Sequence, residues 1–252
     1  METYKTMNFK AENKAAILDI LRSIDIVGPL MSGDRSKEYT EPYAMAHLLS
    51  SLAVGDHLLT FPLEVIHKKP DKPDFLLTMG GKKIGIEHTD ARPENETRKD
   101  VLRRSEEIGR PCRFVNPVEQ DEPRRPAEEL REEIKANAPK KGWPGEDSTD
   151  QDWSRVMLNF IDKKEEKLQK PEFSRYDEDW LLIRDAWPFP SVNPENATRY
   201  LLSKIQSREA KLIFHRVFII SHSDGGPVCE VTESEFLLHP RNVLWPFNSL
   251  LG

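Results

Sequence analysis

Cysteines and long apolar runs are both scarce in this sequence of 252 residues. Cys112 and Cys229 are its only two cysteines, which are too few and too far apart for a disulfide scaffold or a zinc site. No run of about 18 apolar residues is present, so the chain is not expected to cross a membrane. Residues 1–7 contain no apolar core of a signal peptide. A reducing cytoplasm is therefore the expected location.

A strong charge of either sign is also missing. The formal net charge is −6, with 32% charged and 37% hydrophobic residues. A protein that coats nucleic acid by charge alone neutralises many phosphates with Lys and Arg, so this acidic balance argues against that class. An enzyme that acts on nucleic acid is still compatible with it, because such an enzyme needs only a local basic groove and a metal ion that takes the phosphate.

Several common catalytic motifs are absent as well. The sequence has no G-x-x-x-x-G-K-[ST] phosphate loop, no G-x-G-x-x-G and no H-E-x-x-H. Its seven histidines are scattered without the spacing of metal ligands. No nucleophile-elbow pattern indicates Ser-His-Asp chemistry. The chemistry has to be sought in other residues.

The most informative stretch is 73–89, which reads as a β-hairpin. Two apolar, β-branched-rich runs flank Gly80-Gly81, and such a pair supplies the positive φ that a two-residue turn requires. With these glycines as the turn, opposed residue numbers sum to 161, so Asp74 faces Glu87. Alternation along a strand places both carboxylates on one face together with Thr89. The other face is wholly apolar and carries Phe75, Leu77, Ile84 and Ile86.

The two opposed carboxylates predict a divalent-metal site. Directly opposed side chains lie about 4.5–5.5 Å apart, where like charges repel each other. A divalent cation converts this repulsion into ligation, and Mg²⁺ typically takes one or two carboxylates, with water and substrate phosphate completing its shell. The prediction depends on the register, because a slip of one residue would move Glu87 to the other face.

The string P-D-F-L-L, followed by a glycine turn and I-G-I-E-H-T, resembles the PD-(D/E)XK, or restriction-endonuclease-like, superfamily of nucleases. The resemblance implies that Asp74 and Glu87 bind a catalytic Mg²⁺ ion, for which Mn²⁺ can substitute, with the backbone carbonyl of His88 as a further ligand. It also implies in-line attack of a metal-activated water on a phosphodiester, with DNA expected ahead of RNA as the substrate. The superfamily has Lys two residues after the Glu, whereas Thr89 stands there in this chain and can only hydrogen-bond a water or a phosphate oxygen.

A catalytic site would therefore need a lysine from elsewhere in the chain. An amphipathic helix is predicted over 151–169, and Lys164 lies on its apolar stripe. A lysine in a core-facing position has to be paired or has to extend to solvent. In some members of the resembled superfamily a basic residue on this helix replaces the motif lysine. Lys164 is the first choice for that role, Lys167 the second and Lys163 the third, with Lys83 on the hairpin as a rival.

The remaining pattern predicts an α/β fold. Helices are expected over 10–25, from Thr40 onward with Thr40 or Glu41 as the cap and Pro42 in the first turn, over 151–169 and over 194–207. Strands are expected over 57–67, 179–185, 214–220 and, at an edge of the sheet, 228–231. With the hairpin they give a three-stranded meander followed by crossover strands, which is the element order of the restriction-endonuclease-like core. The prediction is a single domain over 1–252, with N-terminal helices in 10–54.

Residues 91–150 are dense in Arg, Lys, Glu, Asp and Pro and read as a charged insertion, with helices near 97–108 and 126–137. The insertion either lines a substrate groove or forms a salt-bridged, solvated surface, which its interspersed signs favour. Glu41 is a further candidate acid, although a glutamate that starts a helix is also favourable to the helix dipole.

Three functions remain open. The first is a Mg²⁺-dependent nuclease. The second is a catalytically inactive module with a nuclease fold, for which Thr89 records lost catalysis and the insertion binds a protein partner or nucleic acid. The third is a subunit whose specificity or activation depends on another protein. Metal binding and cleavage would separate the first two.

Overall fold

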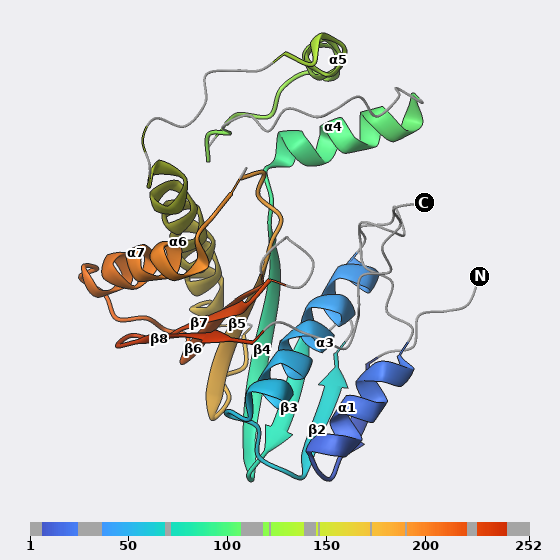
Figure 1. Ribbon diagram of the computed structural model, residues 1–252, viewed down its shortest axis with the longest axis vertical. Helices are drawn as coiled ribbons and strands as arrows, with labels where there is room; N and C mark the ends of the chain where they lie inside the picture. Colours follow the sequence, from blue (N-terminus) through green and yellow to red (C-terminus); the bar gives the residue numbers. More distant parts are fainter. Residues whose placement is uncertain are drawn as a thin grey trace.

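The chain folds as an α/β protein around one eight-stranded mixed sheet (Figure 1). The structure, a computed structural model, describes residues 7–24, 37–68, 72–106, 118–120, 122–138, 145, 147–171, 173–189, 191–220 and 226–240, with the backbone alone at 37–39 and 104. These residues include six helices. None of those helices has the length and apolar composition that a membrane crossing requires.

The strands lie in the sheet in their order along the chain. They are β1 (Phe9–Ala11), β2 (Leu63–His67), β3 (Phe75–Met79), β4 (Lys82–Ala91), β5 (Glu178–Asp185), β6 (Arg216–Ile220), β7 (Val228–Val231) and β8 (Phe236–His239). β1 to β4 pair antiparallel, β4 to β6 parallel, and β6 to β8 antiparallel again. The predicted meander and the two parallel strands after it are therefore confirmed, and β1 and β8 add one strand at each edge.

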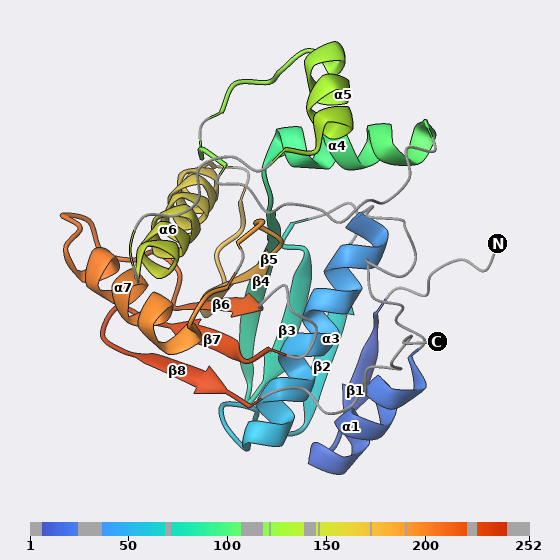
Figure 2. The same ribbon diagram turned by 45° about the horizontal axis from the view of Figure 1, so that its top comes forward.

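Two layers of helices cover the sheet (Figures 1 and 2). α1 (Lys14–Ser23) and α3 (Lys37–Gly55) lie side by side on one face, and α6 (Ser148–Leu168) and α7 (Pro194–Gln206) on the other. α4 (Glu94–Ser105) and α5 (Ala127–Ala136) pack against each other beyond the C-terminal end of β4. The sheet face under α1 and α3 is called the α3 face below, and the opposite one the α6 face.

Several predicted boundaries were wrong. α3 begins at Lys37, so neither Thr40 nor Glu41 caps it, and Pro42 lies inside the helix. The proline is tolerated because only one helical hydrogen bond is missing so close to the N-terminus. The strand predicted over 57–67 starts only at Leu63, and β7 is not at an edge because β8 pairs with it. The insertion is shorter than 91–150, since β4 continues to Ala91 and α6 begins at Ser148.

The hairpin has the predicted register. Gly80 and Gly81 have φ angles of +57° and +78°, which a residue with a side chain rarely adopts, and they connect β3 to β4 in two residues. Phe75 pairs with Ile86 and Leu77 with Ile84. Continuing this pairing by one residue places Asp74 opposite Glu87.

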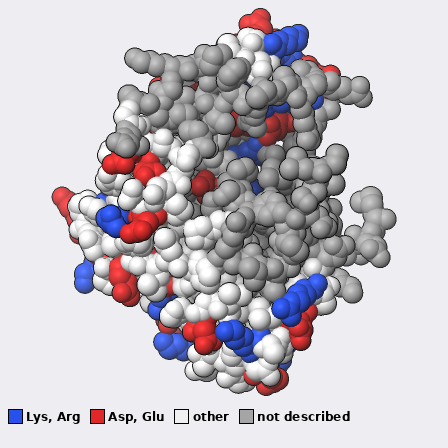
Figure 3. Space-filling model, viewed as in Figure 1, with Lys and Arg blue, Asp and Glu red and all other residues white. Residues whose placement is uncertain are grey.

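The charged insertion is held together by ion pairs. Basic side chains of α4, α5 and the segments beside them pair with carboxylates of the same region, and these pairs are Arg92–Asp100, Arg103–Asp100, Lys99–Glu96, Lys99–Glu133, Arg124–Glu94, Arg125 with Glu122, Glu129 and Glu133, and Arg131 with Glu106 and Glu128. On the face shown in Figure 3, groups of opposite sign likewise lie next to each other. The pairing favours the salt-bridged surface over a groove lining. Residues 107–117, 121, 139–144 and 146 of the insertion lie outside the described residues.

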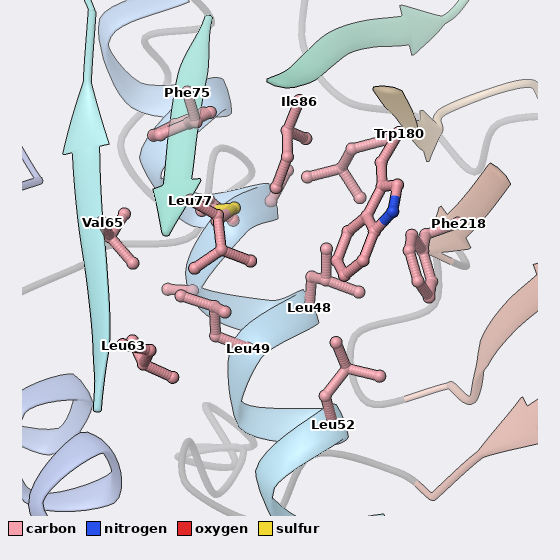
Figure 4. Packing of buried hydrophobic residues seen from close by; sticks show 14 of the residues in the cluster. Leu48, Leu49, Leu52, Leu63, Val65, Phe75, Leu77, Ile86, Trp180 and Phe218 are labelled. Carbon is pink, nitrogen blue, oxygen red and sulfur yellow. The ribbon is translucent and has the colours of Figure 1, made fainter. Parts of the chain in front are cut away.

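The apolar core fills the space between α3 and the sheet. Figure 4 shows Leu48, Leu49 and Leu52 of α3 pointing toward apolar side chains of the sheet. All of these side chains are at most 1% exposed, and they are Leu48, Leu49 and Leu52 against Leu63, Val65, Phe75, Leu77, Ile86, Trp180 and Phe218. A second cluster lies on the α6 face, between β5, β6, α6 and α7. Apolar packing thus covers both faces of the sheet and holds the strands, and with them the residues at the strand ends, in place.

Asp185 ends β5 beneath α6 and is fully buried. Its Oδ2 accepts a hydrogen bond from the indole Nε1 of Trp153 at 2.7 Å, and its Oδ1 accepts one from the backbone N–H of Trp187 at 3.0 Å. Burial raises the pKa of Asp185 from 3.8 to about 6. Because the folded pKa is the higher one, the stability that the protonated carboxyl contributes is complete below about pH 4 and is lost as the pH rises through about 6. The shift corresponds to about 3 kcal/mol.

We expect the indole N–H resonance of Trp153 to titrate with a midpoint near pH 6, because its acceptor changes charge there. The resonance is followed by NMR, and an Asp185→Asn variant should remove the transition. Trp180 is an internal control, because its indole donates a hydrogen bond at 2.9 Å to Glu178. Burial raises the pKa of Glu178, but the hydrogen bonds from Lys82 and Trp180 outweigh burial and leave the pKa below its ordinary value. A Trp153 signal that does not move between about pH 5 and pH 7 would contradict the assignment.

Candidate functional site

Asp74 directly precedes β3, where the pairing with β4 ends. Its backbone carbonyl accepts a hydrogen bond from Lys68 at 2.9 Å, and its Oδ2 accepts one from the backbone N–H of His88 at 2.7 Å. These two bonds fix a half-buried carboxylate beside β4. Its other oxygen, Oδ1, has no hydrogen bond among the described residues, so it is available for a ligand.

Glu87 lies in the middle of β4 and points to the α6 face. It is only 7% exposed. Its Oε2 is 3.1 Å from the Nζ of Lys164, whereas its Oε1 is buried without a hydrogen-bond partner among the described residues. A buried carboxylate oxygen without a partner is costly to a folded protein. Such an atom is where a bound ligand would compensate that cost.

Lys164 comes from the last part of α6 and reaches back across the sheet to Glu87. The side chains of Lys164 and Glu87 are 14% and 9% exposed, so the ion pair is largely withdrawn from water. The position of Lys164 follows from the apolar residues on the same side of the helix. Met157, Ile161 and Leu168 are buried against the sheet, so this side of α6 faces β4 and β5. The structure therefore brings together the first-choice lysine and the predicted glutamate.

The electrostatics of Glu87 reflect two opposed influences. Burial raises its pKa, the ammonium group of Lys164 lowers it, and the nearby charge of Asp74 raises it again, with a net increase above the ordinary value. The two carboxylates are therefore close enough to repel each other, as the register predicts. A cation between them would relieve that repulsion.

His88 contributes through its backbone. Its side chain belongs to the α3 face, as predicted, where burial lowers its pKa and its Nε2 lies 3.5 Å from Asp90. Its N–H points toward Asp74, and in a strand the N–H and C=O of one residue point to the same side. The carbonyl of His88 therefore points to the side of β4 from which β3 has departed, next to Asp74.

The other predicted site residues are arranged less closely. Thr89 lies two residues after Glu87 on the same face, half-buried, and its hydroxyl has no hydrogen bond among the described residues. Lys167 and Lys163 are exposed on α6, and Lys83 is exposed at the start of β4, far from Glu87 along the strand. None of these three lysines is found in an ion pair with Asp74 or Glu87 in the described part of the chain.

The structure also contains buried polar pairs that the sequence did not indicate. On the α3 face, Arg184 of β5 makes two hydrogen bonds of 2.7 Å to Asp90 of β4. Glu41 of α3, a candidate acid in the sequence, lies 3.1 Å from His67 of β2. Glu41 is thus part of a buried pair on the face opposite Glu87. The register of neighbouring parallel strands could have indicated the Asp90–Arg184 pair, because the two residues are direct partners.

The donor set around Glu87 suits a hard metal ion with few protein ligands. No group of three or more His, Cys, Asp and Glu side chains close enough to hold a metal is found among the described residues. Two carboxylate side chains and one backbone carbonyl remain, and all are oxygen donors. Mg²⁺ is commonly bound by one or two carboxylates with water and substrate phosphate, so Asp74, Glu87 and the His88 carbonyl fit it better than they fit zinc.

Comparison of the chain with protein-family models, with curated proteins and with solved structures finds no match. The function has to be argued from the geometry of these residues.

Proposed function

We propose that this chain is a Mg²⁺-dependent phosphodiesterase that cleaves nucleic acid, with DNA as the expected substrate and Mn²⁺ as a substitute metal. The observation that carries the proposal is the different surroundings of the two Glu87 oxygens. Oε2 lies 3.1 Å from Nζ of Lys164, whereas Oε1 is buried without a hydrogen-bond partner among the described residues. Asp74 lies close enough to raise the pKa of Glu87. A metal ion at Oε1 would compensate this buried oxygen, which has no hydrogen-bond partner among the described residues.

The order of the elements supports a restriction-endonuclease-like core for the same protein. The meander of β2, β3 and β4 is followed by α6 and the parallel strand β5, and α7 then leads to β6. The two carboxylates come from neighbouring strands of the meander, and the lysine comes from the helix after it. This combination agrees with the hairpin motif of the sequence, which was identified separately.

Each residue has a defined task in the proposed reaction. Asp74, Glu87 and the carbonyl of His88 would hold the metal, which supplies a polarised phosphate and a more acidic water when bound. Lys164 has three N–H donors, of which one goes to Glu87. Its remaining donors can bind a phosphoryl oxygen and stabilise the charge that develops there, or orient the attacking water. Thr89 can only add a hydrogen bond to a water or a phosphate oxygen.

The test compares wild type with Asp74→Asn. Asparagine can still accept the hydrogen bond from His88, but it loses the negative charge, so we expect Mg²⁺ affinity to fall about 10- to 100-fold with the fold intact. Affinities for Mg²⁺ and Mn²⁺ are measured by calorimetry. Cleavage is measured on supercoiled DNA, single-stranded DNA and structured RNA, with EDTA as the metal-free control.

Glu64→Gln is the matched control for that experiment. Glu64 is a carboxylate on the same sheet face, on the neighbouring strand β2, and its partner is the exposed Lys10 at 3.4 Å. Its replacement should leave metal binding and cleavage unchanged. Full activity of Asp74→Asn would overturn the proposed metal site.

A binding module without catalysis is the second candidate function. The neutral Thr89 at the motif-lysine position favours it, as does the lack of a third metal-binding side chain among the described residues. Metal binding without cleavage of any of the three substrates, or no metal binding at all, would favour this function. A protein partner that binds through the insertion stays a prediction.

A further inference from the structure

Lys72 is a second lysine beside the two carboxylates, and the sequence did not single it out. It lies two residues before Asp74 and is exposed. Its Nζ lies 3.7 Å from the centroid of the Phe173 ring. Phe173 is 9% exposed and belongs to the segment between α6 and β5. This contact places the ammonium group between the start of β3 and the end of α6.

Lys72 lies on the same face of the sheet as Glu87. Its aromatic partner, Phe173, belongs to the buried cluster on the α6 face, to which Glu87 also points. Unlike Lys164, Lys72 is in no ion pair with a carboxylate in the part of the chain that the structure describes. A cation–π contact uses only one side of the ammonium group and does not neutralise its charge. N–H donors therefore remain for an anion.

The other basic groups make this arrangement distinctive. Several arginines of the charged insertion have carboxylate partners within the insertion, as Arg125 and Arg131 do. Lys82, on the same hairpin as Lys72, is paired at 2.9 Å with Glu178. Lys72 thus combines three features: no carboxylate partner among the described residues, a contact with a buried aromatic ring, and a place two residues before Asp74.

We propose that Lys72 binds a phosphate group of the nucleic-acid strand, next to the phosphate that is cleaved. The proposal rests on the proposed function for the identity of the site. Lys72 would contact a non-bridging phosphate oxygen as a point charge, which is how lysine commonly binds phosphate. Lys164 is held by Glu87 at the reacting phosphate, so the two lysines have separate tasks: Lys164 acts on the reaction, and Lys72 holds the strand.

The test measures the affinity of a short DNA duplex for wild type, Lys72→Ala, Lys72→Arg and Lys82→Ala by fluorescence anisotropy. EDTA is present so that the strand stays intact, and the salt concentration is varied from about 50 to about 200 mM. Lys82→Ala is the matched control because it removes one positive charge from the same hairpin, about 17 Å from Glu87 along β4. We expect Lys72→Ala to weaken binding about fivefold and to reduce the slope of log K against log salt by about 1, with Lys72→Arg close to wild type.

Steady-state cleavage in Mg²⁺ gives the second readout. Lys72→Ala should raise KM by about the same factor and leave kcat within about twofold, because the contact is made before and during the reaction alike. Lys82→Ala should change neither constant. A loss of kcat with an unchanged KM would overturn a role in holding the strand.

The two proposals fail in different ways. If wild type cleaves DNA and Lys72→Ala binds it as Lys82→Ala does, the phosphate contact is refuted and the nuclease assignment stands. If wild type cleaves nothing but Lys72→Ala still loses affinity and salt dependence, the contact is supported as part of a binding module and the nuclease assignment falls. If wild type does not bind DNA, the contact is refuted as well.

Discussion

The Glu87→Gln variant is expected to lose cleavage by a factor of at least about 10³ and to show no measurable Mg²⁺ binding. Glu87 is the buried carboxylate of the proposed site, and its Oε1 has no hydrogen-bond partner among the described residues. The amide keeps the size of the side chain but removes its charge. Calorimetry with Mg²⁺ and cleavage of supercoiled DNA measure the two losses. Retained cleavage would exclude Glu87 from the mechanism.

Loss of folding must be separated from loss of the metal. Gln at position 87 leaves the ammonium group of Lys164 buried without its negatively charged partner, and removal of one charge of a buried pair costs about 3–5 kcal/mol. Replacement of both members by neutral residues is often tolerated. The double variant Glu87→Gln/Lys164→Met should therefore be more stable than Glu87→Gln in urea unfolding, and should still be inactive.

The pH dependence of the site follows from the pKa of Glu87. This pKa is raised in the folded protein, mainly by burial, so the stability that the protonated carboxyl contributes is complete below about pH 4.5 and is lost as the pH rises through the folded pKa. Metal binding needs the deprotonated form. Mg²⁺ should accordingly raise the melting temperature more above that pKa than below it. Above the pKa, Glu87 is a buried charge that lowers the stability of the folded protein, and the bound ion would compensate that charge.

The sequence predicted the hairpin well because its geometry is determined locally. The two glycines permit one short turn, the turn fixes the register, and alternation then assigns Asp74 and Glu87 to one face. Lys164 could be selected because an amphipathic helix has to place its apolar side against the sheet, and a lysine on that side needs a partner. Both inferences used only neighbouring residues and the requirement to bury apolar surface.

The features that were missed depend on contacts between distant segments. β1 has only three residues, too few for a pattern of alternation to be recognised, and β8, with the sequence Phe-Leu-Leu-His, shows no alternation of apolar and polar residues. Lys72 approaches Phe173, about a hundred positions further along the chain, and nothing in either local sequence indicates the contact. The start of α3 was wrong for a different reason: a proline near the start of a helix marks its first turn only when no earlier turn can form.

Lys164→Met is the second variant with a large expected effect. It should reduce kcat about 10²- to 10³-fold while Mg²⁺ still binds, because the carboxylates and the His88 carbonyl remain and only the cation at the reacting phosphate is lost. Lys164 lowers the pKa of Glu87, so its removal should also shift the onset of Mg²⁺ binding to higher pH. Single-turnover cleavage measures the first effect, and calorimetry over a range of pH measures the second.

Lys167→Met is the matched control, because Lys167 lies three residues further on α6, is exposed, and was the second choice for the same role. Its replacement should change cleavage less than about twofold, as removal of a solvated lysine usually changes little. If Lys167→Met is the inactive variant and Lys164→Met is active, the ion pair with Glu87 serves stability alone. The lysine that compensates for Thr89 would then be on the exposed side of the helix, and the buried contact would be no guide to the catalytic residue.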